Sequence, residues 1–221
     1  MKTQATTRGG RAFTLTELLV VIFAVAVVVA VLLPALVPDH HSGRQAISCA
    51  SNLKQITIAF RIWAGDNGGK YPMQVSVTNG GAMELAVTGD VAGIFRVMSN
   101  ELATPIIVIC PQDAKRIAAT NFAVGFSDAN ISYFVGLDAE DQYPQMLLSG
   151  DDNLEVNGNR VRPGVLNLST NTSVGWTTER IGKFHGPGNI GLVEGSVWSN
   201  VPTLKSALVN AGIATNRLVI P

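Results

Sequence analysis

"RAFTLTELLVVIFAVAVVVAVLLPAL", residues 11–36, carries one carboxylate, Glu17, at the start of an otherwise uncharged apolar run. Twenty residues, Leu18 to Val37, follow without a charge. As a helix they would be about 30 Å long, which is the thickness of the hydrocarbon core of a bilayer. The run therefore predicts a transmembrane helix over residues 13–37.

The flanking charges predict the orientation of this segment. Lys2, Arg8 and Arg11 precede the run and Asp39 follows it, so the positive-inside rule keeps the N-terminus cytoplasmic and exports the rest. A cleaved secretory signal would have a shorter apolar region. A plain signal anchor fits the length but gives no reason for Glu17. A buried core helix would have a polar face.

Composition limits the other functions. The 221 residues are 47% hydrophobic, which is enough for one globular domain beyond the apolar segment. Sixteen basic residues balance sixteen acidic ones, so nucleic acid is not an expected partner. The two cysteines, Cys49 and Cys110, are too few for a disulfide-dense scaffold or a four-cysteine zinc module.

The N-terminal residues resemble the type IV pilins and type II secretion pseudopilins. The shared pattern is a short basic leader, a small residue, a phenylalanine, a Thr-Leu pair and a glutamate that opens a long apolar helix. In this chain these are Ala12, Phe13, Thr14, Leu15 and Glu17. The residue before the cut is alanine here, where the class normally has glycine.

The resemblance implies processing and assembly. A prepilin peptidase would cut between Ala12 and Phe13, the new amine of Phe13 would be N-methylated, and Glu17 would be needed for assembly. A physical account agrees, because a cationic amine in a low-dielectric setting needs an anion, which Glu17 of a neighbouring subunit can supply.

Downstream, Ala46 to Trp63 has apolar residues at three- and four-residue spacing, which predicts an amphipathic helix that ends at Gly65 and "DNGG". If this helix joins the apolar segment, Phe13 to Ala64 form one long element. Short runs rich in β-branched and aromatic residues predict strands. These runs are "MQVSV" (73–77), "PIIVIC" (105–110), "ISYFVGL" (131–137), "QMLLSG" (145–150), "NIGLV" (189–193) and "SVWSN" (196–200).

The predicted fold class is α+β and pilin-like, with a long N-terminal transmembrane and amphipathic helix packed on a mainly antiparallel sheet. Short helices are expected within Met83–Leu102 and at Leu204–Asn210. The predicted organisation is a cytoplasmic leader (1–12), a transmembrane helix (13–37), a helical stalk (38–66) and an exported globular domain (67–221).

A second region, "HGPGNIGLVEGSVWSN" (185–200), resembles the C-terminal signature of pseudopilin-like proteins of planctomycete and verrucomicrobial bacteria, a histidine followed by Asp-Gly. Here Glu194 replaces the aspartate. His185 and Glu194 could belong to a catalytic site, but no accompanying nucleophile or third ligand has a recognisable spacing. The favoured interpretation is that Glu194-Gly195 forms a hairpin turn. We therefore predict that the chain is not an enzyme.

Two further sets of residues are candidates for sites. Alternating oxygens of Asp151, Asn153, Glu155 and Asn157 are a weak calcium candidate, although the closing glutamate of an EF-hand is missing. The favoured alternative is an Asn-Gly hairpin turn at Asn157-Gly158. In an oxidising compartment Cys49 and Cys110 could form a disulfide if their Cα atoms approach within about 7 Å.

The combined expectation is a structural subunit of a type II secretion pseudopilus or a type IV pilus-like fibre. The partners expected are other pilin-like subunits, the prepilin peptidase, the assembly machinery of the inner membrane and membrane lipid. No cofactor is expected apart from the weak calcium candidate. The alternative is a monomeric, membrane-anchored periplasmic protein that binds a ligand or calcium.

Overall fold

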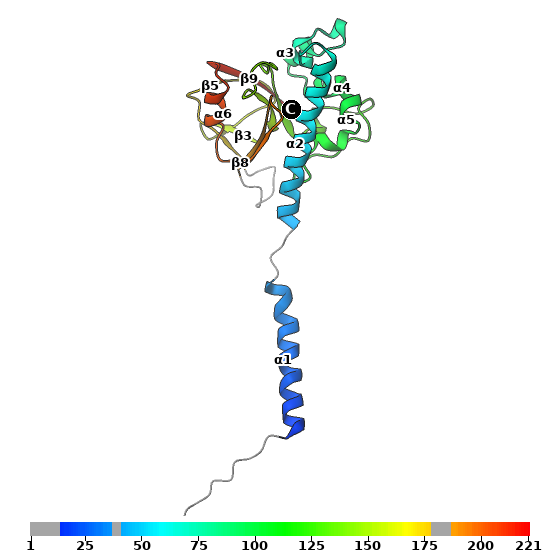
Figure 1. The fold of residues 1–221 in the computed structure, drawn as a ribbon, viewed down its shortest axis with the longest axis vertical. Coiled ribbons are helices and arrows are strands. Elements are labelled where there is room, and N and C mark those ends of the chain that lie inside the picture. The colour runs from blue at the N-terminus through cyan, green and yellow to red at the C-terminus, as the bar shows by residue number, and fades with distance from the viewer. Residues whose placement is uncertain (1–13, 37–40, 178–186) are drawn as a thin grey trace, which may run out of the picture. The chain divides into compact units, whose positions relative to one another are not determined.

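The computed structural model describes residues 14–36, 41–177 and 187–221. The chain divides into two compact units, Met1–His40 and His41–Pro221. The described part of the first unit is one helix, α1 (Leu15–Leu36), and the second unit begins with another, α2 (His41–Asp66) (Figure 1). The possible single element from Phe13 to Ala64 is thus described as two helices.

The expectation of a transmembrane helix over residues 13–37 is corrected. Within the described ranges, no helix has both the length and the apolarity that crossing a membrane requires. The prediction rested on the absence of charge from Leu18 to Val37. An absence of charge does not by itself show that a helix meets both the length and the apolarity requirement. The α+β class and the antiparallel sheet agree with the expectation.

The amphipathic helix predicted for Ala46–Trp63 is confirmed as part of α2. Its apolar positions form the buried face, at most 5% exposed: Cys49, Leu53, Ile56, Phe60 and Trp63. The helix ends where Gly68 and Gly69 take positive φ values of 66° and 78°. These angles are accessible to glycine at low cost and allow Gly69 N to donate back to Ala64 O at 2.8 Å.

Short helices follow α2. The α-helices are α3 (Met83–Thr88), α4 (Val91–Val97), α5 (Ser99–Leu102) and α6 (Lys205–Asn210), and the 3₁₀ turns are η1 (Pro72–Gln74), η2 (Val77–Asn79), η3 (Pro105–Val108) and η4 (Asp128–Asn130). The helices expected within Met83–Leu102 and at Leu204–Asn210 are confirmed.

The strands predicted at "MQVSV" and "PIIVIC" are wrong, because these segments form η1, η2 and η3. Pro72 and Pro105 open two of the turns, and proline favours such a first-turn position because its φ is already set and it has no N–H to leave unpaired. Of the β-branched residues that follow Pro105, Ile107 and Val108 are buried in the core without pairing in a strand.

In the described part of the chain, nine strands form two antiparallel sheets. A six-stranded sheet has the order β5-β9-β1-β2-β7-β8, and a three-stranded sheet has the order β4-β3-β6. Their bounds are β1 (Tyr133–Gly136), β2 (Leu147–Asp151), β3 (Leu154–Val156), β4 (Asn159–Arg160), β5 (Gly164–Ser169), β6 (Val174–Trp176), β7 (Gly188–Leu192), β8 (Val197–Val201) and β9 (Thr215–Ile220). The strands predicted around β1, β2, β7 and β8 are confirmed.

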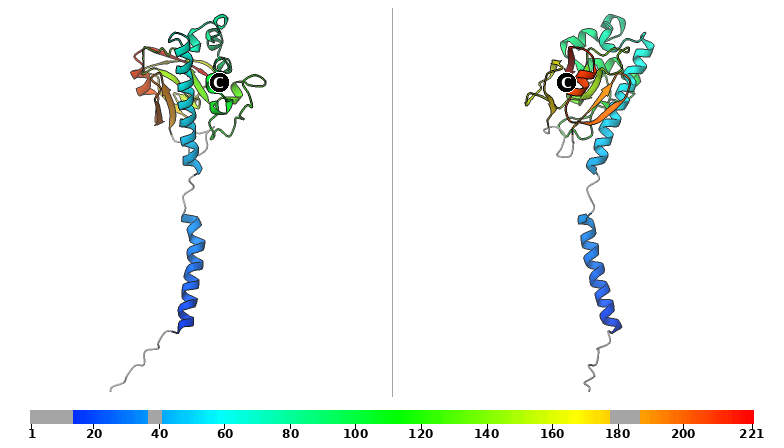
Figure 2. Two further views of the ribbon diagram at one scale, coloured as in Figure 1. Left: turned by 45° about the vertical axis from the view of Figure 1, so that its right-hand side comes forward. Right: turned by 60° about the vertical axis from the view of Figure 1, so that its left-hand side comes forward.

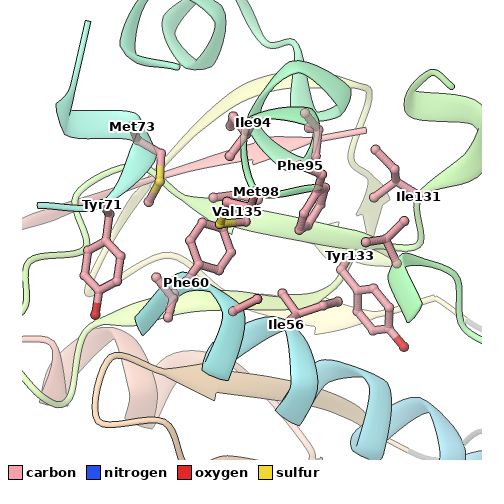
Figure 3. Close-up of a cluster of buried hydrophobic side chains, with 14 of the residues drawn as sticks. Ile56, Phe60, Tyr71, Met73, Ile94, Phe95, Met98, Ile131, Tyr133 and Val135 are labelled. Carbon is pink, nitrogen blue, oxygen red and sulfur yellow. The ribbon is translucent and has the colours of Figure 1, made fainter. Parts of the chain in front are cut away.

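The central strands β1, β2 and β7 of the large sheet are buried on both faces. On β1, Tyr133 and Val135 point into the core shared with α2, α4 and η1, while Phe134 points to the opposite core with α6. Successive strand residues alternate between faces, so a strand covered on both sides is buried throughout. Figure 3 shows the first core, where Phe60 of α2 lies against Tyr71 and Phe95 with ring centroids 6.1 Å apart in each pair.

Helix α2 lies directly on the sheet, between the strands and the short helices α3 to α5 (Figures 1 and 2). The contact is close at Gly191 of β7, where an added Cβ would lie 2.3 Å from Thr57 Cγ2 and 3.5 Å from Leu53 Cγ. No side chain fits at that distance, so the glycine lets the helix and the sheet approach.

Candidate functional site: the capped apolar helix

A capping box opens α1. Thr14 Oγ1 accepts from Glu17 N at 3.3 Å, and Glu17 Oε2 accepts from Thr14 N at 2.9 Å and from its hydroxyl at 2.8 Å. The first N–H groups of a helix have no partner within it, and this reciprocal pair satisfies two of them. The sequence signal for this box is the Thr-x-x-Glu spacing of Thr14 and Glu17.

Glu17 therefore has a local role before any role in assembly is considered. The bond from the Thr14 backbone and then the bond from its hydroxyl lower the pKa of Glu17. The resulting carboxylate lies at the positive end of the helix dipole, where a negative charge is favourable. Oε1 makes no hydrogen bond with any residue that the structure describes, so one oxygen remains accessible to an outside donor.

The body of α1 is apolar and exposed. From Thr14 to Ala30 every described side chain is exposed, including Leu15 at 78% and Phe23 at 73%. A helix that is hydrophobic all round is normally covered by something, since large exposed apolar surfaces mark interaction sites. Glu17 thus stands at the end of an extensive uncovered surface.

The processing residues predicted from the resemblance, Ala12 and Phe13, lie outside the described residues. The candidate His185 does too. The cleavage and methylation at Ala12-Phe13 therefore stay predictions.

The segment around Glu194 forms a turn, as the favoured interpretation expected. Strands β7 and β8 pair antiparallel, Gly195 N donates to Leu192 O at 2.8 Å, and Gly195 has φ 89°. The Glu194 carboxylate accepts from the Ser196 hydroxyl at 2.7 Å. The hairpin prediction is confirmed.

Helix α2 holds this turn with two basic side chains. Lys54 Nζ donates to Gly195 O, and Arg61 Nη1 donates to Glu194 O. Lys54 and Arg61 are seven residues apart and thus two turns along one face of the helix. Helix α2 therefore contacts the turn through main-chain carbonyls that any residue at the turn could supply.

The calcium candidates are placed in separate roles. Asp151 Oδ2 accepts from Asn189, Asn153 Nδ2 donates to Thr177 O, and Glu155 lies on β3. Asn157 and Gly158 have φ values of 51° and 77° and form the turn of the β3–β4 hairpin, which confirms the Asn-Gly alternative. Among the described side chains, no three of His, Cys, Asp or Glu gather as a metal site would need.

The two cysteines form a disulfide. Cys49 on α2 and Cys110 after η3 have Cα atoms 4.8 Å apart, and the sequence separation is 61. Both are buried, at 0% and 1% exposed. Nearby, Asn52 Nδ2 donates to Ile109 O at 3.0 Å and Tyr133 Oη donates to Cys49 O at 3.0 Å. This region ties α2 to the segment that follows η3 and to the sheet.

A buried ionic cluster was missed by sequence reasoning. Arg116 is 9% exposed, lies with Nε 3.3 Å from Asp113 Oδ2, and forms an ion pair with Asp152. Asp113 also accepts from the Ser132 hydroxyl at 2.9 Å. These residues are scattered through irregular segments with no motif spacing, so only the fold brings them together.

Asp151 lies next to this cluster at the end of β2 and is fully buried. Its Oδ2 accepts from Asn189 N at 2.8 Å and from Asn189 Nδ2 at 2.9 Å. The pKa of Asp151 is raised to about 7, mainly by burial and also by the charges of Asp152 and Asp113, while the bonds from Asn189 act to lower it.

Comparison with models of protein families, with curated proteins and with solved structures finds no significant match to this chain.

Proposed function

We propose that this chain is a subunit of a pseudopilus-like or pilus-like fibre, that a prepilin peptidase cuts it between Ala12 and Phe13, and that its role is structural and not catalytic. The observation that carries the proposal is α1, a 22-residue helix whose apolar side chains are exposed from Leu15 to Ala30. Such a surface favours a covered state, and other subunits offer a cover of the same chemistry.

The size of the surface supports assembly over chance exposure. Burying one Leu, Val, Ile or Phe side chain stabilises by roughly 1.5–3 kcal/mol. Eleven such side chains between Leu15 and Val29 are at least 46% exposed. Packing α1 against the α1 of neighbouring subunits would recover part of this free energy from each of them.

Glu17 gives the packing a register. After cleavage, Phe13 would carry a cationic amine, and Glu17 Oε1 of a neighbour can accept a hydrogen bond while Oε2 keeps the capping bonds to Thr14. Charge-assisted hydrogen bonds are stronger than neutral ones, and more so away from water. Capping and assembly therefore do not compete for the same oxygen.

The disulfide supports export of the second unit. A bond between Cys49 and Cys110 persists in an oxidising compartment and is rare in a reducing one. The proposed partners follow: the prepilin peptidase, the assembly machinery of the inner membrane, and other pilin-like subunits.

The processing is tested by intact-mass and N-terminal peptide spectrometry of the protein from its native host. The expected chain begins at Phe13 and carries one additional methyl group. A chain that begins at Met1, or one cut at another site, contradicts the proposed processing.

The role of the Glu17 charge is tested with two variants. Glu17→Gln retains the capping box, because glutamine also serves at its last position, but has no charge. Glu17→Ala loses both. If the charge pairs with the Phe13 amine, both variants lose cross-linkable oligomers. If Glu17 only caps α1, Glu17→Gln assembles like the wild type and the proposed pairing is refuted.

A further inference from the structure

One loop of the second unit presents apolar side chains to solvent. We call residues 117–126, "IAATNFAVGF", the apolar loop. Ile117 is 80% exposed and Val124 is 83% exposed, the highest values among the large apolar side chains described in 41–221. Figure 2 shows the green part of the chain that contains this loop projecting from the body of the unit.

The apolar loop is held in shape from beneath. Arg96 of α4 donates from Nε to Phe122 O at 3.1 Å and from Nη2 to Phe126 O at 3.0 Å. The guanidinium carbon lies 5.9 Å from the Phe126 ring centroid, and the two phenylalanine rings meet edge to face at 5.1 Å. Both rings are buried, so the loop is anchored by its aromatic residues.

Hydrogen bonds fix the exposed positions as well. Asn130 Nδ2 donates to Ile117 O at 2.8 Å. Asn121 Oδ1 accepts from the N–H groups of Ala123 at 2.9 Å and Val124 at 2.8 Å. A loop already ordered in this way loses little conformational entropy when it binds, which favours a role in contact.

A surface groove of about 670 Å³ has a complementary lining. We call it the methionine groove, and its larger apolar residues are Met73, Met83, Val87, Leu137, Met146 and Ile213. Its volume falls within the roughly 300–1,000 Å³ of ligand-binding clefts. Methionine side chains are flexible and polarizable, so they adapt to an apolar guest. Val87 is 63% exposed and Met83 is 39% exposed, so the groove opens to solvent.

Acidic side chains lie at the groove, and a basic side chain precedes the apolar loop. Glu140 lines the groove and Asp141 follows it, and both belong to a segment between β1 and β2. Asp138 is already paired with Arg217, whose Nη2 lies 2.6 Å from Oδ1. Lys115 is exposed two residues before Ile117. An approach that puts Ile117 and Val124 over the groove brings Lys115 toward acids, which favours correct encounter.

We propose that the apolar loop of one subunit docks in the methionine groove of a second copy of this chain, with Val124 against Val87 and Lys115 facing Glu140. No residue of the loop is among those that line the groove of its own chain. The contact is therefore heterologous, joining different surfaces of two copies, and such contacts generate open helical assemblies when they do not close into a ring. This inference rests on the proposed fibre function and names the contact between globular units.

The test is cysteine cross-linking in full-length chains expressed in the native host, with Val124→Cys and Val87→Cys carried on separate, differently tagged copies. The native cysteines are paired in a disulfide and buried. The expected result is a mixed dimer of the two variants. The matched control replaces Val124→Cys with Val209→Cys, an equally apolar residue on α6 that is 54% exposed and lies outside both surfaces.

A mixed dimer no stronger than with the Val209→Cys control overturns the inference. A second variant, Val124→Asp, should weaken oligomer formation about ten-fold, since it puts a charge in an apolar groove. Oligomers that form normally with Val124→Asp also overturn it, although the fibre function then stands. If the wild type itself forms no oligomers while the mixed dimer still appears, the fibre function fails and the loop contact stands. A mixed dimer with another cellular protein in place of the second copy refutes the assigned partner.

Discussion

Replacing Cys49 and Cys110 together by alanine should destabilise the second unit without changing its fold. The disulfide joins α2 to the segment after η3, and both sulfur atoms lie in the core. Alanine is the appropriate replacement because a serine hydroxyl would need a hydrogen-bond partner in an apolar site. The change thus removes the cross-link and leaves the surrounding side chains in place.

The magnitude follows from the length of chain that the bond closes. With a sequence separation of 61, the chain-entropy relation for the unfolded state gives about 4 kcal/mol at room temperature. For a protein of this size each kcal/mol lowers Tm by roughly 2–4 °C, so the double variant should melt roughly 8–16 °C below the oxidised wild type.

The assay is thermal unfolding of the full chain followed by circular dichroism. The wild type in reductant should melt near the double variant, and reductant should not change the melting of the double variant. Either single replacement should cost about as much as both, because each one alone opens the loop. This equality separates the cross-link from the packing of the sulfur atoms.

A loss below about 1 kcal/mol would refute the entropic reasoning. It would mean that the unfolded chain without the cross-link already keeps α2 and Cys110 close together, so that the disulfide adds little. The bonds from Asn52 to Ile109 O and from Tyr133 to Cys49 O would then be the main ties at this point.

Other predictions concern packing, pH and the apolar loop. Gly191→Ala should lower the free energy of unfolding by about 1–3 kcal/mol, because the new methyl overlaps Thr57 Cγ2. Adding Thr57→Ser should recover part of that loss, and failure to do so contradicts the contact. Gly65→Ala in α2, with nothing within 4 Å, should gain about 0.5–1 kcal/mol in the same denaturant titration. Because the folded pKa of Asp151 is about 7, above its ordinary 3.8, the unfolding free energy should fall as pH rises from about 4 to 7. Asp151→Asn should flatten that decline in urea titrations, and an unchanged slope would assign it to other groups. Arg96→Met should increase proteolytic cleavage within the apolar loop, measured by limited digestion and mass spectrometry, and equal cleavage would show that the loop is ordered without the guanidinium.

The repeating patterns of the sequence predicted part of the fold. The three- and four-residue spacing from Ala46 to Trp63 indicates a helix because burial on one side needs that period, and α2 buries that face. The apolar runs around β1, β2, β7 and β8 indicate strands for the corresponding reason. Strands β5 and β9 were missed, because polar residues such as Asn167 and Arg217 interrupt their pattern.

Residue composition gave wrong predictions for two segments. "PIIVIC" has the residues of a strand, but Thr104 caps a 3₁₀ turn by accepting from Ile106 N at 3.5 Å, and Pro105 begins it. The apolar run after Glu17 predicts a membrane span by its hydrophobicity, but no described helix meets the requirements for one. The Glu17 charge has a local explanation, because Glu17 and Thr14 form a capping box three residues apart.

The sequence by itself determined that Ala46–Trp63 is amphipathic and where the glycine and asparagine turns lie, because these depend on residues a few positions apart. Only the tertiary structure decided the contacts between distant segments: Cys49 with Cys110, Arg116 with Asp152, the Lys54 and Arg61 hold on the Glu194 turn, and the placing of an apolar loop and a methionine groove on one unit. Such contacts depend on how helices and sheets pack in three dimensions, and local spacing does not encode that arrangement.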